Sequence, residues 1–141
     1  MSTDLRIRVV SAMADIPAAA WDACANPADS ESQEQAYNPF ISHAFLSALE
    51  SSDSATARAG WQPQHLIAET QGGAALCVVP AYLKSHSRGE YVFDAGWAEA
   101  YERAGRSYYP KVQVSVPFTP AIAVTRPSVP NRKIRPSAMP V

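Results

Sequence analysis

The stretch WQPQHLIAETQGGAALCVVPAYLK, residues 61–84, decides the fold. It contains two runs rich in strand-forming residues, 61–70 and 74–84. The segment Gln71-Gly72-Gly73 separates them and has the conformational freedom that a hairpin turn needs. The second run is apolar at consecutive positions, as expected of a strand that is covered on both faces. Pro80 lacks a backbone donor, so we expect a bulge or an edge position there. The stretch therefore predicts an antiparallel hairpin.

Before the hairpin, the sequence predicts one strand and two helices. Residues 5–12, LRIRVVSA, alternate apolar and basic side chains, which is the period of a half-buried strand with Leu5, Ile7 and Val9 on one side. Asp15 is expected to cap a helix that has Pro17 in its first turn and continues through residues 18–25. Trp21 is the large apolar anchor of this helix.

A polar loop is expected at residues 26–38, because this segment is rich in residues that break helices and strands. Ser42 is the predicted start of a second helix. Its apolar stripe consists of Phe45, Leu46 and Leu49.

After the hairpin, a third helix is expected to begin at Asp94 or Ala95 and to end at Gly105. Trp97 and Tyr101 share one of its faces. The last predicted strand covers residues 108–118, YYPKVQVSVPF. It places one set of side chains on one face and another set on the opposite face, namely Val112, Val114 and Val116 against Lys111, Gln113 and Ser115.

The resulting order, β-α-α-β-β-α-β, indicates an α+β or α/β domain with a mixed, mostly antiparallel sheet flanked by helices. Residues 119–141 differ from the rest: they hold five prolines in 23 residues and show no periodicity. Proline removes backbone donors and fixes φ, so this segment is not expected to build a packed element. We predict a domain over residues 1–120 and a disordered tail, rich in proline and arginine, over residues 121–141.

The composition is that of a soluble protein, with 47% hydrophobic and 18% charged residues. The N-terminus does not resemble a signal peptide and the longest apolar run, residues 74–83, is too short to cross a bilayer, so a cytoplasmic protein without membrane contact is expected. The charge is uneven: residues 1–102 carry −8 and residues 103–141 carry +7. A basic end can contact nucleic acid, but no nucleic-acid-binding motif accompanies it. The three histidines have no metal-ligand spacing, so no metal site is predicted.

The candidate functional residues lie at the ends of the predicted strands, where ligand clefts form in such folds. Lys84 and His86 leave the hairpin with the same parity, and Lys111 and Gln113 share a strand face. Each also has a structural interpretation. Asp94 is at least as well suited to cap the third helix as to act as a base. Trp97 and Tyr101 are more typical of a core than of a ligand wall, and Lys111 of a solvated surface.

Four strings resemble the bacterial FemAB-like proteins, which are peptidoglycan-biosynthesis or GNAT-type N-acyltransferases. They are NPFISHAFLSALESS (38–52), GWQPQHLIAE (60–69), PAYLKSHSRGEYVFDAGWAEAYERAG (80–105) and YYPKVQVSVPFTP (108–120). The resemblance implies part of a GNAT-like fold and transfer of an acyl or aminoacyl group to a small-molecule or peptide amine, from acetyl-CoA or an aminoacyl-tRNA. With it, our candidate residues are Lys84, His86 and Asp94 for catalysis, and Tyr91, Trp97, Tyr109, Lys111, Gln113 and Thr119 for substrate binding.

The sequence departs from the family after VPFTP, where a glycine-containing turn and a helix would form the phosphate-binding loop. No glycine follows Gly105. We therefore expect a truncated or frame-shifted, inactive copy that binds no acyl donor tightly. The alternative is a small non-catalytic binding module with a basic tail. A half-domain would also expose a sheet edge, so we predict self-association through the strand that contains Val112, Val114 and Val116.

Overall fold

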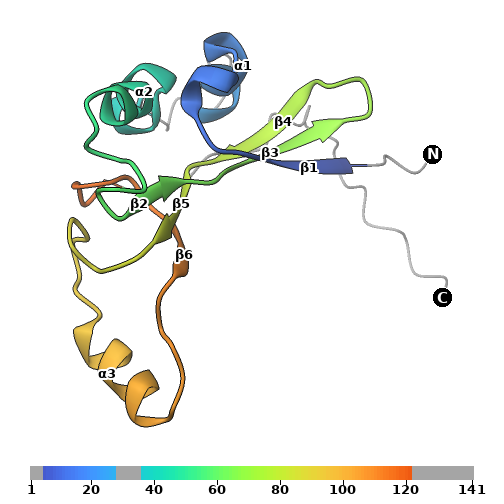
Figure 1. The fold of residues 1–141 in the computed structure, drawn as a ribbon. Coiled ribbons are helices and arrows are strands. Elements are labelled where there is room, and N and C mark those ends of the chain that lie inside the picture. The colour runs from blue at the N-terminus through green and yellow to red at the C-terminus, as the bar shows by residue number, and fades with distance from the viewer. Residues whose placement is uncertain (1–4, 28–35, 122–141) are drawn as a thin grey trace, which may run out of the picture.

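The structure is a computed structural model that describes residues 5–27 and 36–121. Its element order is an α+β mix with antiparallel strand pairing throughout (Figure 1). The strands are β1 (Leu5–Val10), β2 (Trp61–Pro63), β3 (His65–Thr70), β4 (Ala75–Val79), β5 (Ala81–Lys84) and β6 (Lys111–Val114). The α-helices are α1 (Ala18–Ala25), α2 (His43–Ser51) and α3 (Ala95–Arg103), and short 3-10 turns cover Met13–Asp15 and Pro39–Ile41. The predicted α+β class is confirmed, whereas the GNAT-like topology stays a prediction.

The predicted hairpin is present, but each of its two long strands is divided between two consecutive sheets. β3 and β4 pair antiparallel in a sheet of order β1-β3-β4, and β2 and β5 pair in a sheet of order β2-β5-β6. Each long predicted strand is interrupted once, at Gln64 and at Pro80, and the Gln64 amide donates to the Ala81 carbonyl at 2.8 Å across the break. Pro80 has no amide to donate, which explains why β4 ends there. We expected a bulge or an edge position at Pro80, but the irregular register lies between Ala68 and Glu69. Gly73, at φ +83°, closes the hairpin turn.

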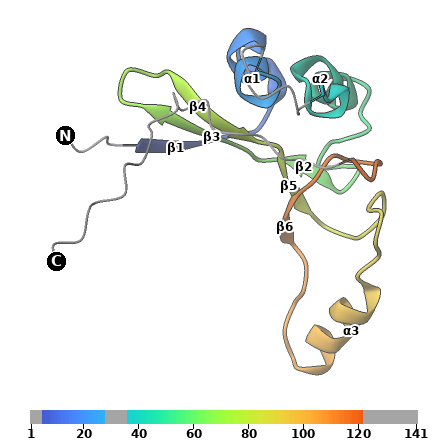
Figure 2. The same ribbon diagram turned by 180° about the vertical axis from the view of Figure 1, so that it is seen from behind.

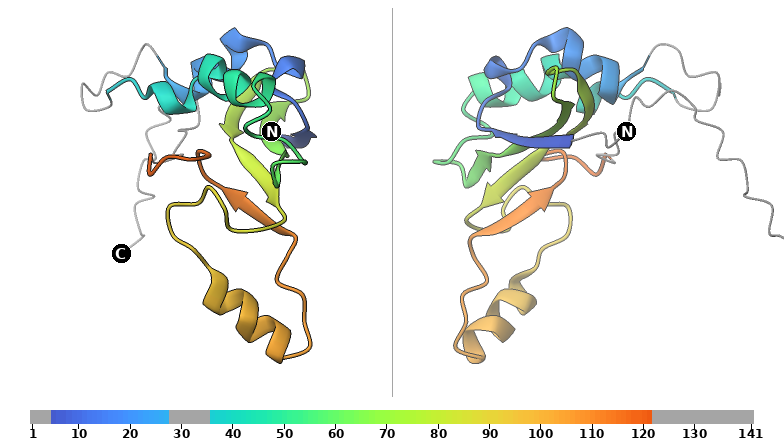
Figure 3. Two further views of the ribbon diagram at one scale, coloured as in Figure 1. Left: turned by 60° about the vertical axis from the view of Figure 1, so that its left-hand side comes forward. Right: turned by 90° about the vertical axis from the view of Figure 1, so that its right-hand side faces the viewer.

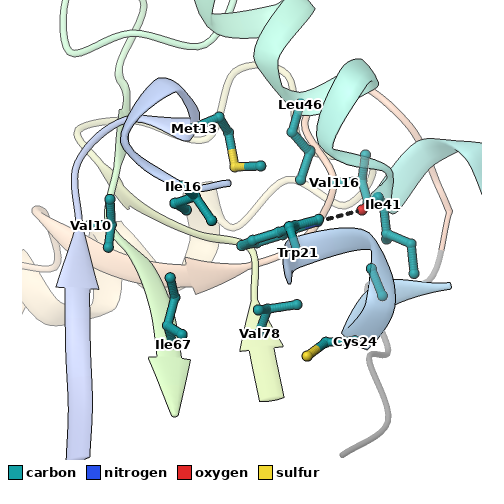
Figure 4. Close-up of a cluster of buried hydrophobic side chains, with 11 residues drawn as sticks. Val10, Met13, Ile16, Trp21, Cys24, Ile41, Leu46, Ile67, Val78 and Val116 are labelled. Atoms are coloured by element: carbon teal, nitrogen blue, oxygen red, sulfur yellow. Dashed lines mark hydrogen bonds between the residues drawn. The ribbon is translucent and has the colours of Figure 1, made fainter. Parts of the chain in front are cut away.

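The core lies between α1, α2 and one face of the first sheet (Figures 2 and 4). Trp21, the predicted anchor, is fully buried there, and its Nε1 donates to the Ile41 carbonyl at 2.8 Å. Leu46 of α2 is buried, while Phe45 and Leu49 pack against the cluster, so the predicted stripe is confirmed. Ser42 caps α2 as predicted, because its Oγ accepts from the Phe45 amide at 3.2 Å.

Several local predictions were wrong. Asp15 lies in the 3-10 turn and does not cap α1, whose N-cap position is Pro17. Leu5, Ile7 and Val9 are not buried but exposed, because the helices cover the opposite face of β1, where Val10 enters the core. The last strand covers only Lys111–Val114, and Val116 turns into the core away from the exposed Val112 and Val114.

The interpretation of Trp97 and Tyr101 as core residues was also wrong. α3 projects from the ends of β5 and β6, away from the main core (Figure 3). None of its residues is buried, and 68% of Trp97 is exposed. Its apolar face is therefore largely exposed, although the Tyr101 ring meets the Tyr108 ring at 5.3 Å between centroids. The predicted tail falls almost entirely on residues 122–141, outside the described residues, and the boundary at residue 120 stays a prediction.

Candidate functional site

A pocket of about 510 Å³ lies between β6 and the segment that leads into α3. Two features of the fold place its walls: β6 presents alternate side chains to one side, and the loop after β5 returns across that side before α3 begins. The pocket brings together Trp61, residues 90–94, Trp97, Tyr108, Lys111, Gln113, Ser115, Val116 and residues 119–121. Large rings therefore stand beside charged groups in one cavity.

Lys111 is the centre of a charged cluster in this pocket. Its Nζ donates to Glu90 Oε2 at 2.9 Å and to Asp94 Oδ2. The Tyr109 hydroxyl donates to the other Asp94 oxygen, Oδ1, at 2.6 Å. The Lys111 side chain is mostly buried and paired with two acids, so the interpretation of Lys111 as a solvated surface residue was wrong.

These contacts fix the charge states of the cluster. Burial alone would raise the pKa of Asp94, but hydrogen bonds from Lys111, Tyr109 and Tyr108 outweigh it and lower the pKa to about 2. Burial likewise disfavours the Lys111 cation, yet its bonds to Asp94 and Glu90 prevail and raise the pKa of Lys111. Asp94 and Lys111 are therefore both charged at neutral pH.

Asp94 occupies the N-cap position of α3, but its side chain does not cap the helix. Both carboxylate oxygens are instead committed to Tyr109 and Lys111. Of the two roles that the sequence left open for Asp94, helix cap or base, the side-chain cap is not present, and the role as a base stays a prediction.

Lys84 lies directly behind the pocket wall. Its ammonium group is fully buried, 3.4 Å from the ring centroid of Trp61, and donates to the Arg88 carbonyl at 3.0 Å. Glu90 Oε1 lies 3.9 Å away. Burial is the main cause that lowers the pKa of Lys84 to about 8, although Glu90 opposes the shift. Lys84 thus supports Glu90 from behind and does not line the cavity.

Two buried acceptor groups of the lining keep unused hydrogen-bonding capacity within the described chain. Glu90 Oε1 has no hydrogen-bond partner there, although its carboxylate is only 5% exposed. The Gln113 amide bonds only to Ser115 Oγ, at 2.9 Å, and its Oε1 is also buried without a partner. Buried acceptors without partners are costly, so each needs an explanation, and a ligand that donates hydrogen bonds supplies one.

Most of the predicted site residues therefore come together. Those that line the pocket are Tyr91, Asp94, Trp97, Lys111, Gln113 and Thr119, while Tyr109 and Lys84 contact the lining. His86 does not join them. The strand ends at Lys84, so the expected shared direction is lost, and His86 lies against Gly60 instead.

Sequence reasoning missed Glu90 and Trp61. Glu90 stands inside a string that the resemblance singled out, next to Tyr91, but no spacing marked it. In the sequence, Trp61 is marked only as a strand residue. Its contact with Lys84 depends on the strand register, which pairs Trp61 of β2 with Lys84 of β5.

The pocket does not fit the phosphates of a carrier such as acetyl-CoA or a tRNA. Lys111 is already bonded to two carboxylates. The amides of Phe118 and Ala121, which follow β6, donate to the Gly89 carbonyl and to Thr119 Oγ1. An anion site needs cations or amides that are free to contact the ligand, whereas the Lys111 ammonium group and these two amides already have partners within the protein. The phosphates of a carrier therefore have no site among the described residues of this pocket.

Residues 5–27 and 36–121 contain no group of three His, Cys, Asp or Glu side chains placed to hold a metal ion. No helix among them has the length and apolar character needed to cross a membrane. The alternative of a binding module with a basic tail rests on residues that lie mostly beyond Ala121, and it stays a prediction.

Comparison with known proteins gives one match. The model of a family described as FemAB-like, peptidoglycan biosynthesis/recognition, matches residues 12–132. This match includes every residue of the pocket. No curated protein and no solved structure matches the chain.

Proposed function

We propose, from the fact that this chain belongs to the FemAB-like family, that its pocket holds the amine of an acceptor substrate for acyl or aminoacyl transfer. The family description supplies the connection with peptidoglycan. The observation that carries the amine is Glu90 Oε1, a buried carboxylate oxygen in the pocket wall without a hydrogen-bond partner among the described residues.

An amine suits the pocket for two reasons. Its N–H groups can donate to Glu90 Oε1 and to the Gln113 amide, which satisfies acceptors that the protein leaves open. The rings of Trp97 and Tyr108 also line the cavity, and aromatic faces attract an ammonium group. Lys111 is bonded to Glu90 Oε2 and Asp94, and the Lys84 ammonium group lies 3.9 Å from Glu90 Oε1. This oxygen therefore has an ion-pair neighbour but no hydrogen bond to lose when an amine binds.

In the proposed transfer, the ammonium group of the acceptor first loses a proton, and we assign Glu90 as the proton acceptor. The freed nitrogen lone pair then forms a bond to the acyl carbon of an ester or thioester. The bond to the carrier oxygen or sulfur breaks with its electron pair. That atom takes up the second proton, which the nitrogen loses as the amide forms, and Glu90 passes the first proton to solvent. With a pKa of about 2, Asp94 is too weak a base for this work, so it acts by holding Lys111 and Tyr109 in place.

Titration calorimetry with two probes that share a four-carbon side chain tests the amine site. Nα-acetyl-lysine amide carries the amine, and Nα-acetyl-norleucine amide lacks it. We expect saturable binding of the lysine probe only. Glu90→Gln should weaken it by about tenfold or more, because a hydrogen bond to a charged group contributes about 1.5–3 kcal/mol. The control is Glu99→Gln, on the exposed side of α3, which should bind as the unaltered protein does.

Equal binding of both probes, or no binding of the lysine probe, would refute the assignment. The same holds if Glu90→Gln and Glu99→Gln bind the lysine probe alike.

A further inference from the structure

One face of the two consecutive sheets is apolar, and we call it the open sheet face. Exposure alternates regularly along β2, β3 and β6 and less regularly along the other strands, and the register joins the less buried positions into rows. Val9 stands opposite Leu66 and Leu66 opposite Val79, while Leu83 stands opposite Val112. The alternation is broken at Pro80 and Ala81, which are both buried. By parity the face extends from β1 to β6, with a buried position between the two sheets.

No described helix covers this face. α1 and α2 both lie on the other side of the sheet, as the views from front and back show (Figures 1 and 2). Five apolar residues at the two ends of the open sheet face are between 52% and 71% exposed: Leu5, Ile7, Val9, Val112 and Val114. A run of such residues is rare on a monomer, where large exposed apolar patches mark interaction sites.

Among the described strand residues, none on the open sheet face is acidic or basic. The charged residues of the strands, Arg6, Arg8, Glu69, Lys84 and Lys111, all have the opposite parity and lie on the helix side. Its polar members are only Gln62, Gln64 and Thr70. A charged partner such as a nucleic acid would therefore find nothing complementary on it. An uncharged apolar surface is complementary to itself, which is the requirement of a two-fold interface.

Its size suits a modest dimer. A strand residue covers about 3.4 by 4.8 Å of sheet, so these strands present roughly 450 Å² of flat area, and side-chain relief adds to it. Stable interfaces bury about 800 Å² on each partner. The face is thus somewhat smaller than a permanent interface needs, which points to a reversible complex.

We propose that two copies of this chain pack their open sheet faces against each other about a two-fold axis, with the sheets roughly 10 Å apart as in a sandwich. This differs from the self-association predicted through the edge of β6. The unpaired edge of β1 is a poor alternative, because antiparallel pairing of two such edges about Ile7 would set Arg6 opposite Arg8 of the second copy.

Sedimentation equilibrium of the full chain tests the proposal, from about 1 μM to about 1 mM, a range that brackets the affinity of a small interface. We expect a monomer–dimer equilibrium. Ile7→Lys and Val112→Lys should each raise the dissociation constant by about tenfold or more, because each places like charges in the interface. Tyr37→Lys, a change at an equally exposed apolar residue outside the face, should leave it unaltered.

Circular dichroism would verify that the variants keep their fold. A monomer at every concentration would overturn the proposal. So would a dimer that both face variants leave intact, or open-ended growth instead of a closed pair.

Discussion

Replacing Asp94 with asparagine should remove a defined part of the acid sensitivity of the fold. The side chain is mostly buried, and asparagine keeps an oxygen for the Tyr109 hydroxyl while losing the charge opposite Lys111. The folded pKa of Asp94 is about 2, against an ordinary value of 3.8. At about 1.4 kcal/mol for each pKa unit, the ionised carboxylate contributes about 2 kcal/mol to the free energy of unfolding.

The sign follows from the depressed pKa. The contribution of Asp94 is present in full well above 3.8, and it is lost as the pH falls towards 2 because the unfolded chain takes up the proton first. The unaltered protein should therefore lose about 2 kcal/mol more than Asp94→Asn between pH 6 and pH 2.

Urea denaturation at a series of pH values measures this difference. Asp53→Asn is the control, because Asp53 forms only an exposed ion pair with Arg58 at 3.8 Å. Its stability should follow that of the unaltered protein across the series. A constant difference between Asp94→Asn and the unaltered protein from pH 6 to pH 2 would show that Lys111 and Tyr109 do not hold the carboxylate as described.

Two further predictions concern the groups behind the pocket. Burial lowers the pKa of Lys84 to about 8 from 10.5, so between these pH values the unfolded chain binds a proton that the folded chain lacks, and the free energy of unfolding should rise with pH. Urea denaturation should show that Lys84→Met lacks this rise. An equal rise in the variant would contradict the assignment. Gly89→Ala should lower the melting temperature by more than Gly105→Ala does. Both glycines have positive φ, but only at Gly89 would the added Cβ lie 2.5 Å from the Phe118 ring. Equal losses would show that the Phe118 side chain moves aside without cost.

The sequence predicted the elements that short-range rules determine. The turn at residues 71–73, the Ser42 cap and the buried Trp21 each follow from local residue chemistry, and all three are present in the structure. The burial of faces was harder, because a strand pattern shows two faces without showing which one the helices will cover. Leu5, Ile7 and Val9 therefore alternate as a buried row does and yet lie exposed.

The sequence predicted most residues of the candidate site but not the contacts between their side chains. The parity of Lys111 and Gln113 placed both on the pocket side, and the string around residues 90–97 supplied the opposite wall. The sequence could not predict that the Asp94 side chain would bond Lys111 instead of capping α3, because this choice depends on the distance between α3 and β6. The exclusion of His86 likewise depends on where β5 ends.

The interruptions at Gln64 and Pro80 divide the same pair of strands into a part that supports the core and a part that supports the pocket. On one side of them lie the residues around Trp21 that hold α1 and α2, and on the other side lies most of the pocket lining. Effects of substitutions at well-separated positions are close to additive. Over evolutionary time, the lining can therefore drift and acquire new preferences while the scaffold stays intact, and comparison of diverged descendants should find variation concentrated beyond the two breaks.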